Sequence, residues 1–120
     1  MFDTEDILNN PLAPKGIRLG QEVAIPFRND MVAAIEGGRK CCTSRNKRYG
    51  NPGDFFILHG RRYRITSIQR CGLDHVAHSL YTEEGVNTSA EFIALWEEMH
   101  PLKGFDPNQK VWTHFFEVVA

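Results

Sequence analysis

Hydrophobic and polar positions change period several times along the chain, and the changes predict strands interrupted by helices. Short apolar or alternating runs predict five strands, over residues 22–27, 41–45, 54–59, 62–71 and 111–119. Apolar spacings of three and four predict helices that follow caps at Asn29 or Asp30, at Asp74, and at Thr88 or Ser89. We therefore expect about five strands with two or three inserted helices.

The run over 62–71 reads as the partner of the preceding strand, joined to it by a hairpin at Gly60. Strict alternation puts Tyr63, Ile65 and Ser67 on one face and Ile68 on the other. Such partial alternation is typical of a barrel wall with one wet side. Together with the returning terminal strand, it favours an α+β protein built on a small closed or partly open β-barrel.

Length and composition agree with one globular domain. The chain has 120 residues, of which 42% are hydrophobic and 24% charged. The turn-rich start predicts an N-terminal extension over 1–20, and the domain follows over 21–120. No run is apolar enough to cross a membrane, and three cysteines suit a reducing compartment. We expect a cytoplasmic protein that makes no membrane contact.

Charge is unevenly distributed although the net charge is only −1. Between Arg28 and Arg70 the chain carries ten basic residues against three acidic ones, a local balance of +7. This segregation suits an anionic partner such as nucleic acid or a nucleotide. A solvated surface paired with the acidic remainder of the chain explains the count equally well.

The candidate chemistry gathers in residues 37–45, where two glycines precede a cationic and hydroxyl-bearing strand. Gly37 and Gly38 allow a tight turn. On the strand that follows, Lys40, Cys42 and Ser44 point one way, whereas Cys41, Thr43 and Arg45 point the other. The stretch can hold an anion or polarise a carbonyl.

The ordered motifs of the chain resemble those of a known family. They are Gly-Arg-Lys-x-x-Thr-x-Arg over 38–45, Pro-Gly-Asp before the hairpin, Glu-Gly at 84–85, and Phe-x-x-x-Trp at 92–96. This order resembles the ASCH domain, a PUA-like β-barrel, over about residues 22–119. The resemblance implies association with RNA. One small branch of the family hydrolyses N4-acetylcytidine to cytidine with a Lys, a Thr and a Glu, which match Lys40, Thr43 and Glu84.

Two departures from that branch stand at the site itself. Cys41 and Cys42 occupy positions where the branch usually has Thr-Ile or a similar pair, and Gly85 stands where Asn often follows the acid. The resemblance therefore supports the fold of the family more strongly than the activity of that branch.

The three matching residues form a coherent catalytic set. A threonine hydroxyl needs a nearby base, which Lys40 supplies if burial or neighbouring cations favour its neutral amine. Glu84 would orient the lysine or protonate the leaving amine, and Arg45 would steady the acetyl oxygen or a phosphate. Lys40 and Thr43 have opposite parity on an ideal strand, so the backbone at Cys41-Cys42 must bulge or turn for both to face one pocket.

The sequence thus predicts a small amidohydrolase that deacylates N4-acetylcytidine-type nucleosides. The alternative is a non-catalytic RNA-binding module, or a ribonuclease, that uses the same basic cleft, with Lys40 and Glu84 as a structural ion pair. The expected partner is a nucleoside or RNA, the expected assembly is a monomer or a weak dimer, and no cofactor or metal is expected. The substrate or RNA would be bound by five further residues: Arg39, Arg45, Tyr49, Arg62 and Arg64.

Three other patterns have simpler explanations. Cys71, His75 and His78 have only loosely metal-like spacing, and we interpret them as a core cysteine with surface histidines. Cys42 with His59 or His114 would be a nucleophile pair, but free cysteine is more often a small buried hydrophobe. The last pattern is a helical apolar stripe that we assign to the core: Phe92, Trp96 and Met99.

Overall fold

The computed structural model of the protein describes residues 20–120, and the predicted extension over 1–20 lies outside this part except for Gly20. Four strands and three helices make up the described chain. In order they are α2 (Asn29–Glu36), β1 (Cys42–Arg45), β2 (Phe55–Leu58), β3 (Arg61–Gly72), α3 (Leu73–Ser79), α4 (Ser89–Met99) and β4 (Lys110–Val118).

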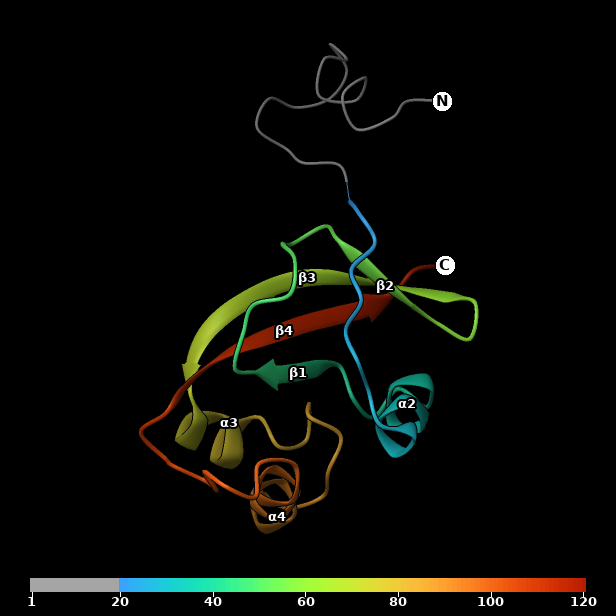
Figure 1. The fold of residues 1–120 in the computed structure, drawn as a ribbon. Helices are drawn as coiled ribbons and strands as arrows, with labels where there is room; N and C mark the ends of the chain where they lie inside the picture. The colour runs from blue at the N-terminus through green and yellow to red at the C-terminus, as the bar shows by residue number, and fades with distance from the viewer. Residues whose placement is uncertain (1–19) are drawn as a thin grey trace.

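The strands form one antiparallel sheet in the order β1-β4-β3-β2. The two long strands, β3 and β4, lie in its centre and curve strongly, so the sheet curls into half of a barrel (Figure 1). Helix α2 lies at one end of the curved sheet, and α3 with α4 lies at the other (Figure 1). The α+β, PUA-like architecture expected from the sequence is therefore confirmed. The described sheet has four strands instead of five.

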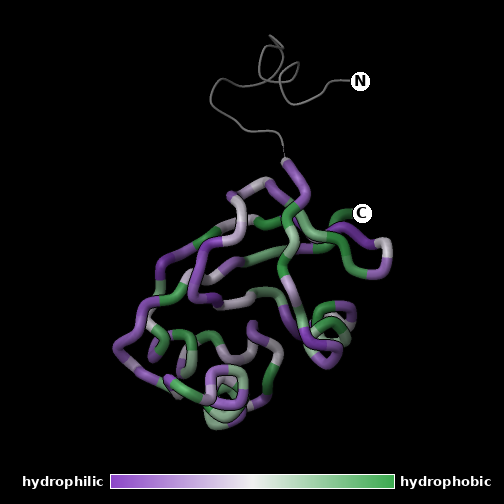
Figure 2. Tube along the Cα trace, viewed as in Figure 1, coloured by the Kyte–Doolittle hydropathy of each residue, from purple (hydrophilic) through white to green (hydrophobic). Residues whose placement is uncertain are grey.

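Two hydrophobic cores lie on opposite faces of this sheet. On one face α2 contributes Ile35, which packs with Phe56, Ile65 and Phe116 from the strands. On the other face α3 and α4 pack against Cys71 and Val111 of β3 and β4. Figure 2 shows hydrophobic and hydrophilic positions interspersed along the strands and helices. Each face of the sheet is thus covered over a different part of its length.

A β-bulge in β3 corrects the predicted face assignment. The register with β4 shifts between Ile65 and Ser67, so the strand contains one extra residue there. The side chains beyond the bulge exchange faces, and Ile68 packs with the same core as Ile65. Strict alternation was wrong from Ser67 onward because it assumed an unbroken strand.

The predicted first strand over 22–27 is only a single parallel bridge between Glu22 and Phe55. Its backbone bonds to β2 stop at Val23, and Pro26 has no N–H to continue a ladder. Two helix caps also differ from the prediction. Arg28 precedes α2 with Asp30 inside its first turn, and Gly72 precedes α3 with Asp74 inside its first turn.

Other local signals are confirmed. Thr88 caps α4 through its side-chain oxygen, which accepts a hydrogen bond from the Glu91 N–H at 3.0 Å. The hairpin between β2 and β3 turns at His59 and Gly60, which both have positive φ, at 49° and 81°. Between residues 20 and 120 no helix has the length and apolar character needed to span a membrane.

Candidate functional site

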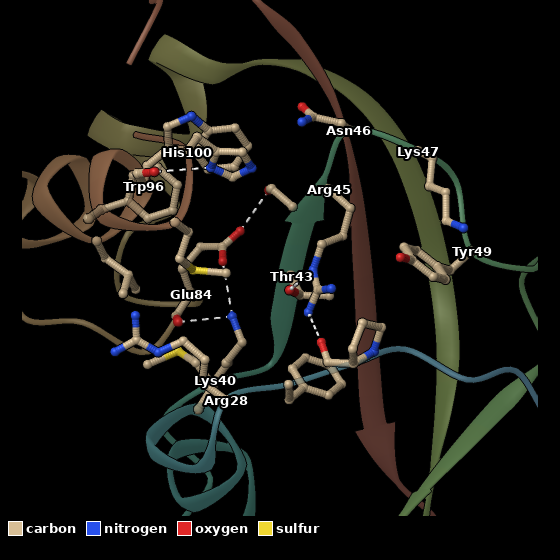
Figure 3. A pocket seen from close by; sticks show the side chains of 17 residues that line it. Arg28, Lys40, Thr43, Arg45, Asn46, Lys47, Tyr49, Glu84, Trp96 and His100 are labelled. Atoms are coloured by element: carbon tan, nitrogen blue, oxygen red, sulfur yellow. Dashed lines mark hydrogen bonds and ion pairs between the residues drawn. The ribbon is translucent and has the colours of Figure 1, made fainter. Parts of the chain in front are cut away.

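A pocket of about 360 Å³ lies at the open edge of β1, between that strand, the chain that precedes α2, and helix α4 (Figure 3). Its volume is within the range of sites for small organic ligands. Polar side chains come from the strand and from the loop that follows it, and α4 supplies an apolar wall. Residues lining it include Lys40, Thr43, Ser44, Arg45, Asn46, Lys47, Tyr49, Glu84, Phe92, Leu95, Trp96, Met99 and His100.

A buried ion pair between Lys40 and Glu84 forms the polar centre of the pocket. The Lys40 Nζ donates to Glu84 Oε1 at 3.0 Å and to the Glu84 carbonyl oxygen at 3.1 Å. The other carboxylate oxygen accepts a hydrogen bond from Ser44 Oγ at 2.6 Å. Lys40 and Glu84 are only 4% and 5% exposed. Both carboxylate oxygens are therefore held, and two of the three ammonium donors are used.

Lys40 and Glu84 are 44 residues apart in the sequence, and backbone contacts bring them together. Lys40 and Glu84 form an isolated antiparallel bridge, and the N–H groups of Cys41 and Cys42 both donate to the Glu83 carbonyl. Gly85 has a φ of 95°, and a Cβ at that position would lie 2.9 Å from the Lys40 Cβ. The Glu-Gly pair in the sequence thus reflects a close packing of residues 84 and 85 against the strand entrance.

Thr43 and Arg45 reach the same pocket from the opposite face of β1. The Thr43 hydroxyl accepts a hydrogen bond from Arg45 Nε at 3.1 Å, and Arg45 also donates to the Pro26 carbonyl (Figure 3). Since β1 is an edge strand, a pocket beside it can be lined from both faces. Lys40 and Ser44 keep the alternation and both contact Glu84 on one face, while Thr43 lies on the other. The predicted parity conflict is resolved in this way.

Arg45 is held between aromatic rings. Its guanidinium carbon lies 5.0 Å from the centre of the Phe27 ring and 5.8 Å from that of Tyr49. Burial lowers the pKa of Arg45 from its usual value, and the nearby Tyr49 and Glu84 oppose that change. The side chain therefore presents a fixed cation beside the Thr43 hydroxyl.

His114 supports Thr43 from beneath and is fully buried. Its Nε2 accepts a hydrogen bond from the Tyr49 N–H at 2.8 Å, so Nδ1 must carry the proton that it shares with the Thr43 carbonyl at 3.2 Å. Burial lowers the pKa of His114, partly opposed by its hydrogen bond to Thr43 and assisted by the positive charge of Arg45. The neutral ring joins β1, β4 and the loop that carries Tyr49.

The depressed pKa of His114 predicts a loss of stability in mild acid. In the unfolded chain the ring takes up a proton near its ordinary pKa of 6.5, whereas the folded state resists it. The contribution of neutral His114 to the free energy of unfolding is therefore complete above pH 6.5 and is lost as the pH falls below that value. We expect urea unfolding of the native protein to show this decline as the pH falls below 6.5, and the variant His114→Gln to show a shallower one. Equal slopes for the two proteins would contradict the assignment.

The structure gathers five of the predicted site residues and separates the others. Lys40, Thr43 and Glu84 line one pocket with Arg45 and Tyr49. The remaining three lie outside it. Arg39 is exposed, and Arg62 and Arg64 lie on β3 beside a different and smaller hollow, where Arg64 pairs with Glu117 at 2.9 Å. The basic residues chosen by charge alone therefore do not form one surface.

Several pocket residues were missed or given another role, among them Ser44, Trp96 and His100. Ser44 bonds to the catalytic candidate Glu84, and its shared parity with Lys40 was the available signal. Trp96 belongs to the core, as predicted, but also lines the pocket, where its ring stacks on His100 with centroids 4.1 Å apart. Nothing in the sequence indicated that His100 lines the pocket, because its position depends on where α4 ends relative to β1.

The cysteine and metal alternatives find no support in residues 20–120. Cys42 is completely buried, and burial strongly raises the pKa of its thiol, which disfavours the nucleophilic thiolate. Both ring nitrogens of His114 are occupied by the Thr43 carbonyl and the Tyr49 N–H. Cys71 is buried while His75 and His78 are exposed, and the described chain contains no group of three or more His, Cys, Asp or Glu side chains placed to hold a metal ion.

Comparison of the sequence with protein-family models gives no match, and no curated protein matches it. Solved structures do match its fold. An ASCH domain from Lactobacillus crispatus JV V101 has a TM-score of 0.60 and 15% identity, and the match covers 95% of this chain and 89% of that one. The hypothetical protein PH0355 has a TM-score of 0.61 and 15% identity, with 84% and 100% covered. Protein EF3133 from Enterococcus faecalis V583 has a TM-score of 0.57 and 18% identity, with 96% and 88% covered.

These likenesses define the structural class of the protein. Its α+β half-barrel, with the pocket at the edge of β1, has the fold of an ASCH domain. The identities of 15% and 18% establish the fold alone, and the chemistry must be argued from the pocket.

Proposed function

We propose that the protein is an amidohydrolase that removes the acyl group from N4-acetylcytidine-type nucleosides. The observation that carries the proposal is the convergence of Lys40, Thr43 and Glu84 on one pocket of about 360 Å³. Their buried amine, alcohol and carboxylate are the groups that acyl transfer requires: a base, a nucleophile and a proton donor for the leaving amine.

Proton transfer within the Lys40–Glu84 pair prepares the site. In a buried environment the ion pair and the neutral pair are closer in energy than in water, because each charge has lost its hydration. Movement of one proton from Nζ to Oε1 across 3.0 Å gives a neutral amine and a carboxylic acid. The amine is then the general base and the acid is the general acid.

Thr43 attacks the acyl carbonyl carbon in the first half of the reaction. Arg45 donates to the Thr43 oxygen, so the hydroxyl proton points elsewhere and the developing negative charge is stabilised. No direct hydrogen bond joins Thr43 to Lys40, so in this mechanism solvent relays the proton to Nζ. Glu84 gives its proton to the N4 nitrogen as the C–N bond breaks, which leaves cytidine, an acyl-Thr43 ester and the charged Lys40–Glu84 pair.

Water completes the cycle with the roles reversed. Glu84 accepts a proton from the water that attacks the ester carbonyl, and Lys40 returns a proton to the Thr43 oxygen as the C–O bond breaks. The products are the free carboxylic acid and the threonine hydroxyl. Transfer of the proton from Glu84 back to Lys40 restores the resting ion pair, so every proton is accounted for.

The test is turnover of N4-acetylcytidine, followed by the change in its ultraviolet spectrum. We expect the intact protein to release cytidine and Thr43→Val to lower kcat by about 10³-fold or more, because the variant keeps the side-chain shape but has no nucleophile. Thr66→Val, on the exposed part of β3, is the matched control and should retain full activity. Absence of turnover by the intact protein over the neutral pH range would refute the proposal.

A further inference from the structure

The main chain of Ser44 lies at the open edge of β1, on the wall of the pocket. In an antiparallel pair every second residue directs its N–H and C=O toward the partner strand, and the residues between direct theirs away. The Cys41 carbonyl accepts a hydrogen bond from the Phe116 N–H beside it at 3.0 Å. The Cys42 N–H instead points away from β4, to the Glu83 carbonyl at 3.1 Å. Ser44, two residues after Cys42, therefore directs its N–H and C=O away from β4 as well.

These two main-chain groups of Ser44 are open to the pocket. The residue is only 7% exposed, and within residues 20–120 neither its N–H nor its carbonyl oxygen has a hydrogen-bond partner outside the sheet. Figure 3 shows Glu84, Trp96 and His100 on this side of β1, opposite β4. Since buried main-chain groups almost always have a partner, an unpaired N–H and C=O on a pocket wall are available to a ligand.

The side chain of Ser44 holds this main chain in place. Its Oγ donates to Glu84 Oε2 at 2.6 Å, which uses its one hydrogen, so it accepts from Thr113 Oγ1 at 2.8 Å. The hydroxyl is thus fully engaged within the protein. The open N–H and C=O consequently lie beside the proposed acid, Glu84, and directly after the proposed nucleophile, Thr43.

We propose that the main chain of Ser44 selects the base by pairing with the edge of an N4-acylated cytosine: its N–H donates to the ring nitrogen N3, and its C=O accepts from N4–H. The inference rests on the proposed function and deepens it, because it names the groups that recognise the substrate. An extended residue presents its N–H and C=O side by side, as one donor and one acceptor. The acylated base presents the acceptor N3 next to the donor N4–H, so both hydrogen bonds can form together.

This pairing also orients the substrate for the reaction. It places N4 next to Glu84, which is to protonate it, and the acyl carbon within one residue of Thr43. A uracil ring is disfavoured, because its N3–H and O4 would set donor against donor and acceptor against acceptor. A buried group that is built to bond a substrate atom rejects an analogue lacking that atom, since the group is then left unpaired.

The test compares N4-acetylcytidine with N4-acetyl-3-deazacytidine, in which a C–H group replaces N3. Binding of each compound to Thr43→Val is measured by isothermal titration calorimetry, so that neither is consumed and the chemical reactivity of the two amides has no effect. We expect the 3-deaza compound to bind about 100-fold more weakly. Affinities within about threefold of each other would overturn the inference, as would the absence of measurable binding by N4-acetylcytidine.

Ser44→Pro and Ser44→Ala, each made in the Thr43→Val protein, test the N–H itself. Proline removes the N–H, and because that group points off the edge of the sheet, no bond of the ladder is lost. Alanine is the matched control, since it loses the same hydroxyl but keeps the N–H. We expect Ser44→Ala to retain the preference for N4-acetylcytidine and Ser44→Pro to reduce it to about threefold or less.

Urea unfolding establishes whether each variant is folded. A folded Ser44→Pro protein with the full preference would assign N3 to another donor and overturn the inference. If Ser44→Pro does not fold, the comparison of the two compounds on Thr43→Val decides the matter.

The binding experiment does not depend on catalysis. Turnover of N4-acetylcytidine by the intact protein, with equal binding of the two compounds to Thr43→Val, would leave the proposed function standing and refute the role of Ser44. Preferential binding of N4-acetylcytidine without turnover by the intact protein would support the role of Ser44 and refute the hydrolase.

Discussion

Lys40→Met is expected to lower kcat for deacetylation by about 10³-fold or more. Methionine has nearly the length of lysine but cannot accept or return a proton, and general acid–base catalysis contributes roughly 10²- to 10⁴-fold. Lys40 would act in both halves of the reaction, first as the base for Thr43 and then as the acid for its release. The measurement is the steady-state rate of cytidine formation at saturating substrate.

Arg39→Met is the control for that experiment. Arg39 is the neighbouring cation in the sequence but is exposed outside the pocket, so its loss should leave kcat within about twofold of the parent. If Lys40→Met kept most of the activity, the amine could not be the base. Lys40 would then be the structural partner of Glu84 alone.

Glu84→Gln is expected to destabilise the fold by about 3–5 kcal/mol, in addition to abolishing turnover. The substitution removes one partner of an ion pair whose residues are 4% and 5% exposed, and an uncompensated buried charge is costly. Lys40 Nζ would keep neutral oxygen acceptors at residue 84, the backbone carbonyl and the amide oxygen, but no negative charge to compensate its own. The free energy of unfolding is obtained from urea titration near neutral pH.

The double variant Lys40→Met/Glu84→Gln tests whether the two buried charges are energetically coupled. Removing both charges removes the cost of the unpaired one, so the double variant should be more stable than Glu84→Gln alone. The amide introduced at position 84 would retain Ser44 as a hydrogen-bond partner. Simple additivity of the two single substitutions would show that the pair is not coupled, despite the 3.0 Å distance between the two charged groups.

Local signals in the sequence were sufficient for most of the elements, although the strand predicted over 22–27 is only a single bridge. Thr88 caps α4 as predicted because its side chain satisfies a backbone N–H three residues on, which is a purely local interaction. The turn at His59 and Gly60 is local in the same way. The bulge between Ile65 and Ser67 was not predictable, because it is a property of the pairing with β4, about fifty residues later.

The candidate site, like the fold, was predictable only in part. The short block from Lys40 to Arg45 was identified from residue types and order, and Glu84 only from the family resemblance; the shared parity of Lys40 and Ser44 was available in the sequence. The convergence of these residues on one pocket could not be predicted from the sequence. It depends on the bridge between residues 40 and 84 and on β1 lying at an edge of the sheet. Charge counts were a poorer guide, since Arg62 and Arg64 lie away from the pocket while Arg48 and Arg70 flank Trp112.

The sequence by itself determined four of the five predicted strands, the helices, the main turns, and which residues carry an amine, an alcohol or a carboxylate. Hydrophobic period, capping and turn preferences act over a few residues, so they can be recognised without the fold. Only the tertiary structure decided that Ser44 holds Glu84, that Arg45 bonds to Thr43, and that Trp112 lies between two arginines. Those contacts join residues that strand order and register bring together, and neither is encoded in any single segment.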